Sequence, residues 1–131
     1  MAHASQQINP SDAETTLQIS RVFKASREKV YNAWVDPKAL AQWWGPEGHT
    51  ATIDVLEVKP GGTYRTAMTS PEGVEMWVGG TFNEVSANEK LVFTWAWEDA
   101  EKPGQSGHET RVTIAFQDAA GGTEVTLTHE L

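Results

Sequence analysis

The chain alternates hydrophobic and polar residues in a series of short segments, and this alternation is typical of half-buried β-strands. Turn-forming residues such as glycine, proline and asparagine separate most of these segments. Strands joined by such short turns are antiparallel neighbours, so the pattern predicts a meander. The expected strands span residues 15–23, 51–58, 63–70, 74–85, 91–97, 111–117 and 123–129.

Two short helices are expected between the first and the second strand. The first spans residues 26–35 and begins at a serine, a favourable N-cap. The second begins at Asp36-Pro37, which suits the N-cap and first helical positions, and a Gly-Pro pair ends it. Its apolar face carries Leu40, Trp43 and Trp44 at helical spacing. Because so short a helix is marginal alone, these tryptophans must pack against the sheet.

One face of the predicted sheet is strongly apolar, whereas the opposite face carries mainly Thr, Ala, Arg and Glu. The two helices lie together in the sequence between the first two strands, which makes the fold class α+β. They are too small to cover the apolar face. Residues 98–107 are expected to form a charged loop, and Gly79-Gly80 indicates a bulge or sharp bend. The residues of the apolar face are Met76, Val78, Phe82, Leu91, Phe93, Trp95, Trp97, Val112, Ile114, Phe116, Val125 and Leu127.

Composition narrows the classes of partner. The 131 residues suit one domain, expected over residues 15–131, after a polar tail at residues 1–14 that is expected to be flexible. A net charge of −8 argues against nucleic acid and anionic membranes as partners. No apolar run approaches the length of a transmembrane helix, and the start of the chain lacks the hydrophobic region of a secretory signal. The absence of cysteine fits a cytoplasmic protein.

The residues that carry chemistry do not form a recognisable catalytic or metal site. No serine lies in a Gly-x-Ser-x-Gly motif, and the four histidines lack ligand spacing. Asp54 and Glu57 are three residues apart on one strand and therefore point to opposite faces. His129 follows the apolar alternation of the last strand and could face a cavity, although a hydrogen-bonded structural role is the simpler interpretation. We therefore predict no catalytic residue, no metal and no cofactor.

A set of motifs in a fixed order resembles a known family. The chain is similar to the activator of heat-shock protein 90 ATPase homologue family, within the START and birch-pollen-allergen helix-grip superfamily (SRPBCC). The similarity covers residues 15–131, and the ordered set is specific although each piece alone is weak. Its motifs are Arg21-Val-Phe-Lys-Ala-Ser, Val30-Tyr-Asn-Ala-Trp, Asp36-Pro37, Gln42-Trp-Trp-Gly-Pro, Gly61-Gly-Thr-Tyr, Gly80-Thr-Phe-Asn-Glu-Val and Lys90-Leu-Val-Phe-Thr-Trp.

The resemblance implies a β-α-α-β6-α order, in which a curved antiparallel sheet grips a long C-terminal helix around a hydrophobic cavity. This sequence departs from that pattern because it stops at residues 128–131, where the family's last strand ends. The long helix is therefore expected to be missing and the apolar face to be open. Three consequences follow as alternatives: self-association through the uncovered face, local rearrangement, or a sequence cut short of a longer natural chain.

The aromatic residues are the positive signal for function. The sequence contains six tryptophans, and ordinary core packing explains any one of them. Together, on a sheet face that needs more cover, they resemble the walls of a mostly apolar pocket with a few polar groups. Indole N–H groups, Tyr64 and Arg65 could supply the polar groups. The predicted ligand-binding residues are Trp44, Met76, Val78, Phe93, Trp95, Trp97 and Ile114.

We therefore predict a protein that binds a small hydrophobic or aromatic molecule without catalysing a reaction on it. Two alternatives remain. The family's namesake suggests a protein-interaction module that stimulates a chaperone ATPase, with a chaperone as partner and a role in the stress response. Some superfamily members are cyclases, aromatases or hydroxylases, so a cofactor-free cyclase or hydrolase is the third reading, by analogy of fold alone.

Overall fold

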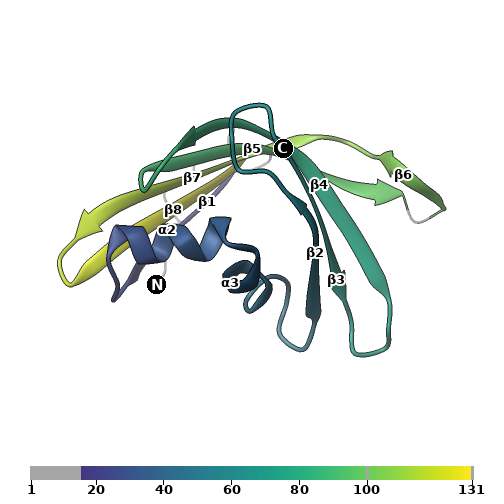
Figure 1. The fold of residues 1–131 in the computed structure, drawn as a ribbon, viewed down its shortest axis with the longest axis horizontal. Coiled ribbons are helices and arrows are strands. Elements are labelled where there is room, and N and C mark those ends of the chain that lie inside the picture. Colours follow the sequence, from purple (N-terminus) through teal and green to yellow (C-terminus); the bar gives the residue numbers. More distant parts are fainter. Residues whose placement is uncertain (1–15, 100, 131) are drawn as a thin grey trace.

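A curved antiparallel sheet with two short helices on its concave side forms the molecule (Figure 1). The computed structural model describes residues 16–99 and 101–130, so the predicted tail at residues 1–14 lies outside the described residues. The elements are β1 Thr16–Phe23, α2 Arg27–Val35, α3 Pro37–Ala41, β2 Thr50–Leu56, β3 Thr63–Thr69, β4 Glu75–Ser86, β5 Lys90–Asp99, β6 Lys102–Ser106, β7 Thr110–Ala119 and β8 Gly122–Glu130.

The strands follow one another in space almost as they do in sequence. The order across the sheet is β1–β8–β7–β5–β4–β3–β2, and β6 pairs with β5 beside this path. The exception is β1, which pairs with the last strand, so that Thr16 lies opposite Glu130 and Phe23 opposite Thr123. The α+β class predicted from the sequence is confirmed.

One segment differs from the prediction. Residues 98–107 were expected to form a loop, but β5 continues to Asp99 and β6 returns beside it, with Glu98 opposite Ser106. Seven strands therefore follow the helices within the described residues, where six were expected. The alternation signal failed here because a proline and a glycine, both rare inside strands, lie in the β6 segment.

The helix caps are those predicted. The Ser26 hydroxyl accepts a hydrogen bond from the Lys29 amide at 3.2 Å, and the Asp36 carboxylate accepts one from the Ala39 amide at 2.9 Å. Pro37 is the first residue of α3, where no amide donor is needed. These caps fix the entry of each helix and place α2 and α3 against the concave face.

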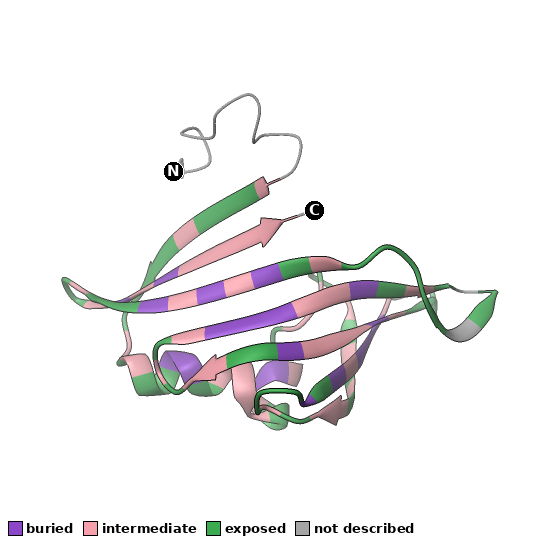
Figure 2. Ribbon diagram, turned by 90° about the horizontal axis from the view of Figure 1, so that it is seen from above, coloured by how far each residue is buried: buried purple, intermediate pink, exposed green. Residues whose placement is uncertain are grey.

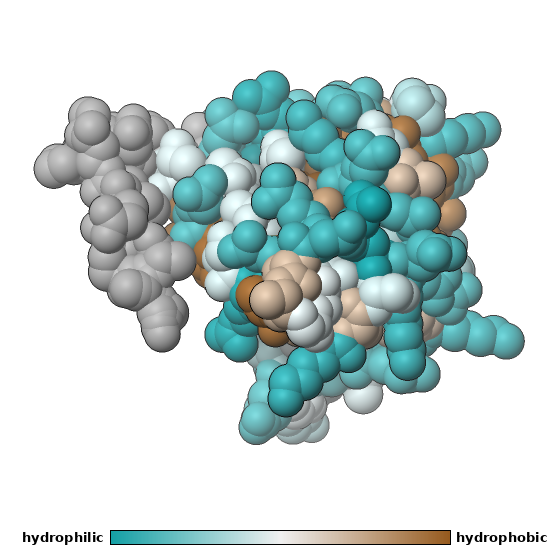
Figure 3. Space-filling view, turned by 90° about the vertical axis from the view of Figure 1, so that its left-hand side faces the viewer, coloured by the Kyte–Doolittle hydropathy of each residue, from teal (hydrophilic) through white to brown (hydrophobic). Residues whose placement is uncertain are grey.

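The core lies between the concave face and α2, and the register confirms the predicted sharing of faces. Phe93 lies opposite Phe82 and Val112, and Ile114 opposite Leu91 and Leu127. The buried residues gather in the middle of the sheet, along β5 and β7 (Figure 2). Figure 3 shows the end of the molecule that carries α2 and the β7–β8 turn. The surface there is mostly hydrophilic, and apolar side chains are limited to small areas.

Strand β4 approaches its neighbours closely where the sequence has two glycines. A side chain at Gly80 would collide with the Thr94 carbonyl of β5, and this pair of strands has no ladder partners between Gly79 and Phe82. The Tyr64 hydroxyl of β3 donates a hydrogen bond of 2.5 Å to the Thr94 carbonyl as well. The bulge itself lies two residues beyond the glycines, between Phe82 and Glu84. The glycines therefore mark a close backbone contact at Gly80, which other residues would prevent, and not the bulge.

Candidate functional site

Five of the six tryptophans form one connected chain of indole rings across the concave side. The ring centroids of successive members lie 4.6 to 6.5 Å apart, with interplanar angles of 60° to 90°. This is the tilted and edge-to-face geometry that aromatic pairs prefer. The chain starts on α2, passes the end of α3 and finishes on β5, and its members are Trp34, Trp43, Trp44, Trp95 and Trp97. We refer to it as the indole chain.

The turn after α3 connects the helices to the sheet. The Trp44 indole donates a hydrogen bond to the Thr66 hydroxyl of β3 at 2.9 Å, whereas the Trp43 indole turns back and donates to the Ala33 carbonyl of α2. Trp44 is therefore half-buried against the sheet, and Trp43 remains exposed. The two adjacent tryptophans therefore bond to different elements: Trp43 bonds to helix α2, and Trp44 bonds to strand β3.

The structure separates the seven predicted ligand-binding residues into two groups. Val78, Phe93 and Ile114 are buried in the core beneath the concave surface. Trp44 and Trp95 are half-buried, and two others reach solvent: Trp97 is 39% exposed and Met76 is 48% exposed. The surface that an added molecule could touch therefore comprises Trp44, Met76, Trp95 and Trp97.

A polar pair lies beside this apolar surface. The Thr110 hydroxyl is 2.6 Å from Nε2 of His129 and 3.2 Å from the Trp95 carbonyl, so the three groups share one hydrogen-bonding network. The His129 ring meets the Trp95 ring edge to face at 6.2 Å. Partial burial lowers the pKa of His129 from its ordinary value of 6.5, which keeps the imidazole neutral near pH 7. The site therefore offers one uncharged donor–acceptor pair.

The groups proposed from sequence as polar partners in the pocket are elsewhere. Tyr64 points into the core, where burial raises the pKa of its hydroxyl. Arg65 lies on the outer, convex face: its guanidinium is 3.8 Å from the centre of the Trp77 ring and pairs with Glu98 and Asp54. Sequence alternation alone could have placed Arg65 outside, because it lies opposite Gly79, next to the inward-facing Val78.

A small space lies inside the core near this surface. It lies under the turn after α3, has a volume of about 20 Å³ and could hold one water molecule. A wider apolar hollow of about 370 Å³ opens between the end of β1 and the helices, with Lys29 at its margin. Among its lining residues are Phe23, Val30, Trp34 and Trp43, so it meets the helical end of the indole chain.

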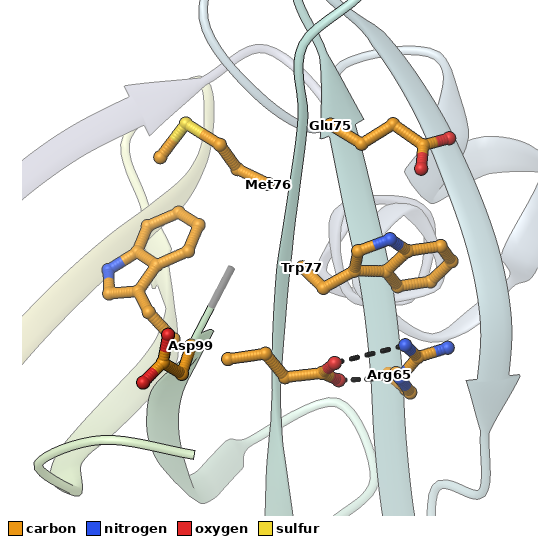
Figure 4. Close-up of a pocket in the computed structure, with 7 residues that line it drawn as sticks. Arg65, Glu75, Met76, Trp77 and Asp99 are labelled. Atoms are coloured by element: carbon orange, nitrogen blue, oxygen red, sulfur yellow. Dashed lines mark hydrogen bonds and ion pairs between the residues drawn. The ribbon is translucent and has the colours of Figure 1, made fainter. Parts of the chain in front are cut away.

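A second wide hollow lies at the opposite end of the indole chain, where β5 leaves β4. Its volume is about 400 Å³. Figure 4 shows Met76 on one side of β4 and Glu75 and Trp77 on the other. The remaining lining residues are Arg65, Trp97, Glu98 and Asp99. We call this hollow the β4–β5 fork.

The described parts of the chain hold neither a membrane-spanning helix nor a cluster of three metal-ligating side chains. None of their helices is long and apolar enough to cross a membrane. No three His, Asp or Glu side chains come together there as a metal site. Asp54 and Glu57 are not brought together either, because Asp54 pairs with Arg65 and Glu57 accepts hydrogen bonds from Thr63.

Comparison with known proteins gives a family and a fold. The model of the family described as "Activator of Hsp90 ATPase homolog 1-like protein" matches residues 24–131. A solved structure of a protein from Chromobacterium violaceum is 26% identical, with a TM-score of 0.80 over 88% of this chain and 79% of that one. The AHSA1 protein from Silicibacter pomeroyi is 27% identical, with a TM-score of 0.78 over the same shares of the two chains.

A more distant neighbour extends the structural match. A protein from Arthrobacter aurescens is 24% identical, and its solution structure superposes with a TM-score of 0.83 over 98% of this chain and 75% of that one. No curated protein matches the sequence. The helix-grip fold predicted from the sequence is confirmed by these structures.

Proposed function

The chain belongs to the Activator of Hsp90 ATPase homolog 1-like family, and we propose that it binds a small apolar or aromatic molecule on the concave face of its sheet. The observation that carries the proposal is the indole chain. Its sheet end, Trp95 and Trp97, remains partly open to solvent, although indole rings are among the side chains that gain most from burial. A bound planar molecule would cover these rings.

The shape and chemistry of the surface indicate the class of ligand. Trp95 and Trp97 meet at 90°, so their rings form two walls of a corner, and Met76 supplies a flexible third side. Val78, Phe93 and Ile114 form the packed layer beneath, which holds the walls in position. A flat ring system fits such a corner better than a charged or a highly hydrated molecule.

The Thr110–His129 pair favours a ligand that carries a polar group. A neutral imidazole and a hydroxyl at the margin of an apolar surface can bind a hydroxyl or carbonyl group, but they offer no charge to an anion. The preferred ligand is therefore an aromatic or polycyclic molecule that carries one hydroxyl or carbonyl group. The proposed binding involves no chemical step.

A second candidate function rests on the same pair. A neutral histidine 2.6 Å from a hydroxyl is the arrangement of a general base, so a cofactor-free enzyme that removes a proton from the bound molecule is the alternative. Replacing His129 with glutamine separates the two functions. A binding protein retains affinity and never shows turnover, whereas the enzyme loses turnover while it continues to bind.

Tryptophan fluorescence tests the proposal directly. We expect planar aromatic alcohols or ketones to quench the emission, and the amide signals around residues 93–97 to shift in the NMR spectrum. Trp97→Leu should weaken binding by roughly tenfold, because one buried aromatic contact contributes about 1 kcal/mol or more. No response to a chemically broad set of apolar molecules would contradict the proposal.

Trp43→Leu is the matched control. Trp43 is exposed to nearly the same extent as Trp97, but it lies at the helical end of the indole chain. We expect this variant to retain the affinity of the unaltered protein. Loss of binding in Trp43→Leu alone would place the ligand in the hollow beside α2 and contradict the site proposed on β5.

A further inference from the structure

The β4–β5 fork leaves two strand edges without a partner. The two strands are paired from Val78 opposite Trp97 to Ser86 opposite Lys90. Beyond Val78, residues 75–77 of β4 continue to pair with β3, and residues 98–99 of β5 pair with β6. The opposite edges of these two segments, in β4 and in β5, face the fork. The backbone N–H and C=O groups on those edges are available to an added strand.

The walls of the fork combine apolar surface with negative charge. Met76, Trp77 and Trp97 supply the apolar part. Glu75 and Asp99 stand on opposite strands at its margin, and no cation is paired with either of them among the described residues. Figure 4 shows Asp99 on the same side of β4 as Met76, whereas Glu75 lies on the side of Trp77 and Arg65, so each face of the fork carries one carboxylate.

The cation already in the fork does not balance these carboxylates. The Arg65 guanidinium binds Glu98 through two hydrogen bonds of 2.5 and 3.0 Å and Asp54 through a third of 3.0 Å. The Glu98 side chain is only 10% exposed, so this pairing belongs to the wall rather than to the open space. A further positive charge on the Met76 side of the fork would be attracted mainly by Asp99, and one on the Trp77 side by Glu75.

We propose that the β4–β5 fork binds an extended peptide segment of a partner protein that carries a lysine or arginine side chain. The peptide backbone pairs with the open edge of β4 at residues 75–77, and the basic side chain enters the hollow between Met76, Trp97 and Asp99. This is strand addition combined with charge recognition, and it differs from the binding of an apolar molecule on the concave face.

Charge and size both support this occupant. The volume of about 400 Å³ lies within the range of recognised binding pockets and suits one long side chain better than a folded element. The aliphatic part of lysine or arginine can lie along Met76 and Trp97, and its charged end can reach Asp99. The net charge of −8 also steers basic partners towards the molecule.

Four synthetic probes test the proposal on the full chain. They are the peptide Ac-Thr-Val-Lys-Val-Thr-NH2, its glutamate counterpart, the lysine peptide with its three central amides N-methylated, and n-butylammonium. We expect the lysine peptide to bind and to shift the amide signals of residues 75–77. The glutamate and N-methylated peptides should bind at least roughly tenfold more weakly, the first from charge and the second from lost backbone pairing.

The other outcomes overturn the proposal. Equal binding of the lysine and glutamate peptides would exclude charge recognition. Binding of n-butylammonium or of the N-methylated peptide as strong as that of the parent peptide would show that the fork takes a free cation and not a strand.

Variants of the protein locate the binding site of the lysine peptide on the molecule. Asp99→Asn should weaken binding of the lysine peptide by about two- to fivefold, as expected for a partly exposed ion pair, and the effect should fade at high salt. Glu75→Gln, on the other side of β4, should have a smaller effect. Glu124→Gln on β8 removes the same charge far from the fork and should change nothing. Equal effects of all three substitutions would contradict the site. Trp97 borders both proposed sites, so these variants avoid it, and apolar ligands should bind them normally.

Discussion

The Trp44 indole and the Thr66 hydroxyl are joined by a hydrogen bond of 2.9 Å between the turn after α3 and the inner face of β3. Thr66 has no exposed surface, so its hydroxyl has no access to bulk water. Helix α3 itself carries the buried Leu40. One polar and one apolar contact therefore hold this five-residue helix, which could not persist alone, against the sheet.

Breaking this hydrogen bond should reveal a measurable coupling. Trp44→Phe removes the donor and Thr66→Val the acceptor, and each leaves its partner without a hydrogen bond. The double variant should therefore lose about 1 kcal/mol less free energy of unfolding than the sum of the two single variants. Urea denaturation of the four proteins measures the cycle. Additive losses would show that Trp44 is held by ring packing alone.

Arginine at position 65 should resist replacement more than arginine at position 111. Arg65 makes a forked pair with the nearly buried Glu98, binds Asp54 and covers Trp77. Lysine cannot reproduce this planar fork. Arg111 also pairs with a carboxylate, Glu130, but both side chains are well exposed.

Thermal unfolding compares the two positions. Arg65→Lys should lower the unfolding midpoint clearly, and Arg111→Lys should leave it nearly unchanged. If both variants unfold at the same temperature, the Arg65 cluster does not hold the outer face together.

A side chain at Gly80 should destabilise the packing of β4 against β5. The added methyl group of Gly80→Ala would collide with the Thr94 carbonyl, and backbone atoms cannot move aside as a flexible side chain can. We expect a loss of about 3 kcal/mol in the free energy of unfolding. Gly107→Ala is the control, since its methyl group would lie 3.7 Å from the nearest atom, the Trp97 carbonyl oxygen. Similar losses at both positions would show that the collision with the Thr94 carbonyl is not the cause.

The stability of the protein should fall on mild acidification because of His129. Burial lowers its pKa in the folded state below 6.5, so the unfolded chain binds a proton at a higher pH than the folded one. The contribution to stability is therefore complete above about pH 6.5 and is lost as the pH falls towards the lower, folded-state value.

For one group, the slope cannot exceed about 1.36 kcal/mol per pH unit. Chemical denaturation at pH 7.5, 6.5 and 5.5 measures it, and His129→Gln should flatten the profile over this interval. An unchanged profile in the variant would assign the pH dependence to other groups.

Much of the fold could be predicted because burial of one face imposes a strict alternation on each strand. The pairing of Phe93 with Phe82 and Val112 follows from that alternation, and the caps at Ser26 and Asp36 follow from local chemistry. Strand β6 was missed because its pairing with β5 depends on hairpin geometry and not on a buried face.

The site was less predictable than the fold. Alternation identified Trp95, Trp97 and His129 as residues of the concave face, but it could not show that the indoles connect. The contact between Trp44 and Trp95 joins a turn and a strand some fifty residues apart, and no local pattern reports such a contact. Likewise, the fork exists because β5 diverges from β4 after Trp97, whereas the sequence continues to alternate.

The pairing of β1 with β8 also has a consequence for biosynthesis. On the ribosome β1 emerges first, and roughly a hundred further residues follow before its partner exists. At about 5–20 residues per second, that interval is about 5–20 s. Throughout it, Leu17, Ile19 and Phe23 lack the strand beside which they fold. The first strand synthesised is thus the last to join the sheet, and a nascent chain stalled before β8 would be a natural client for chaperones.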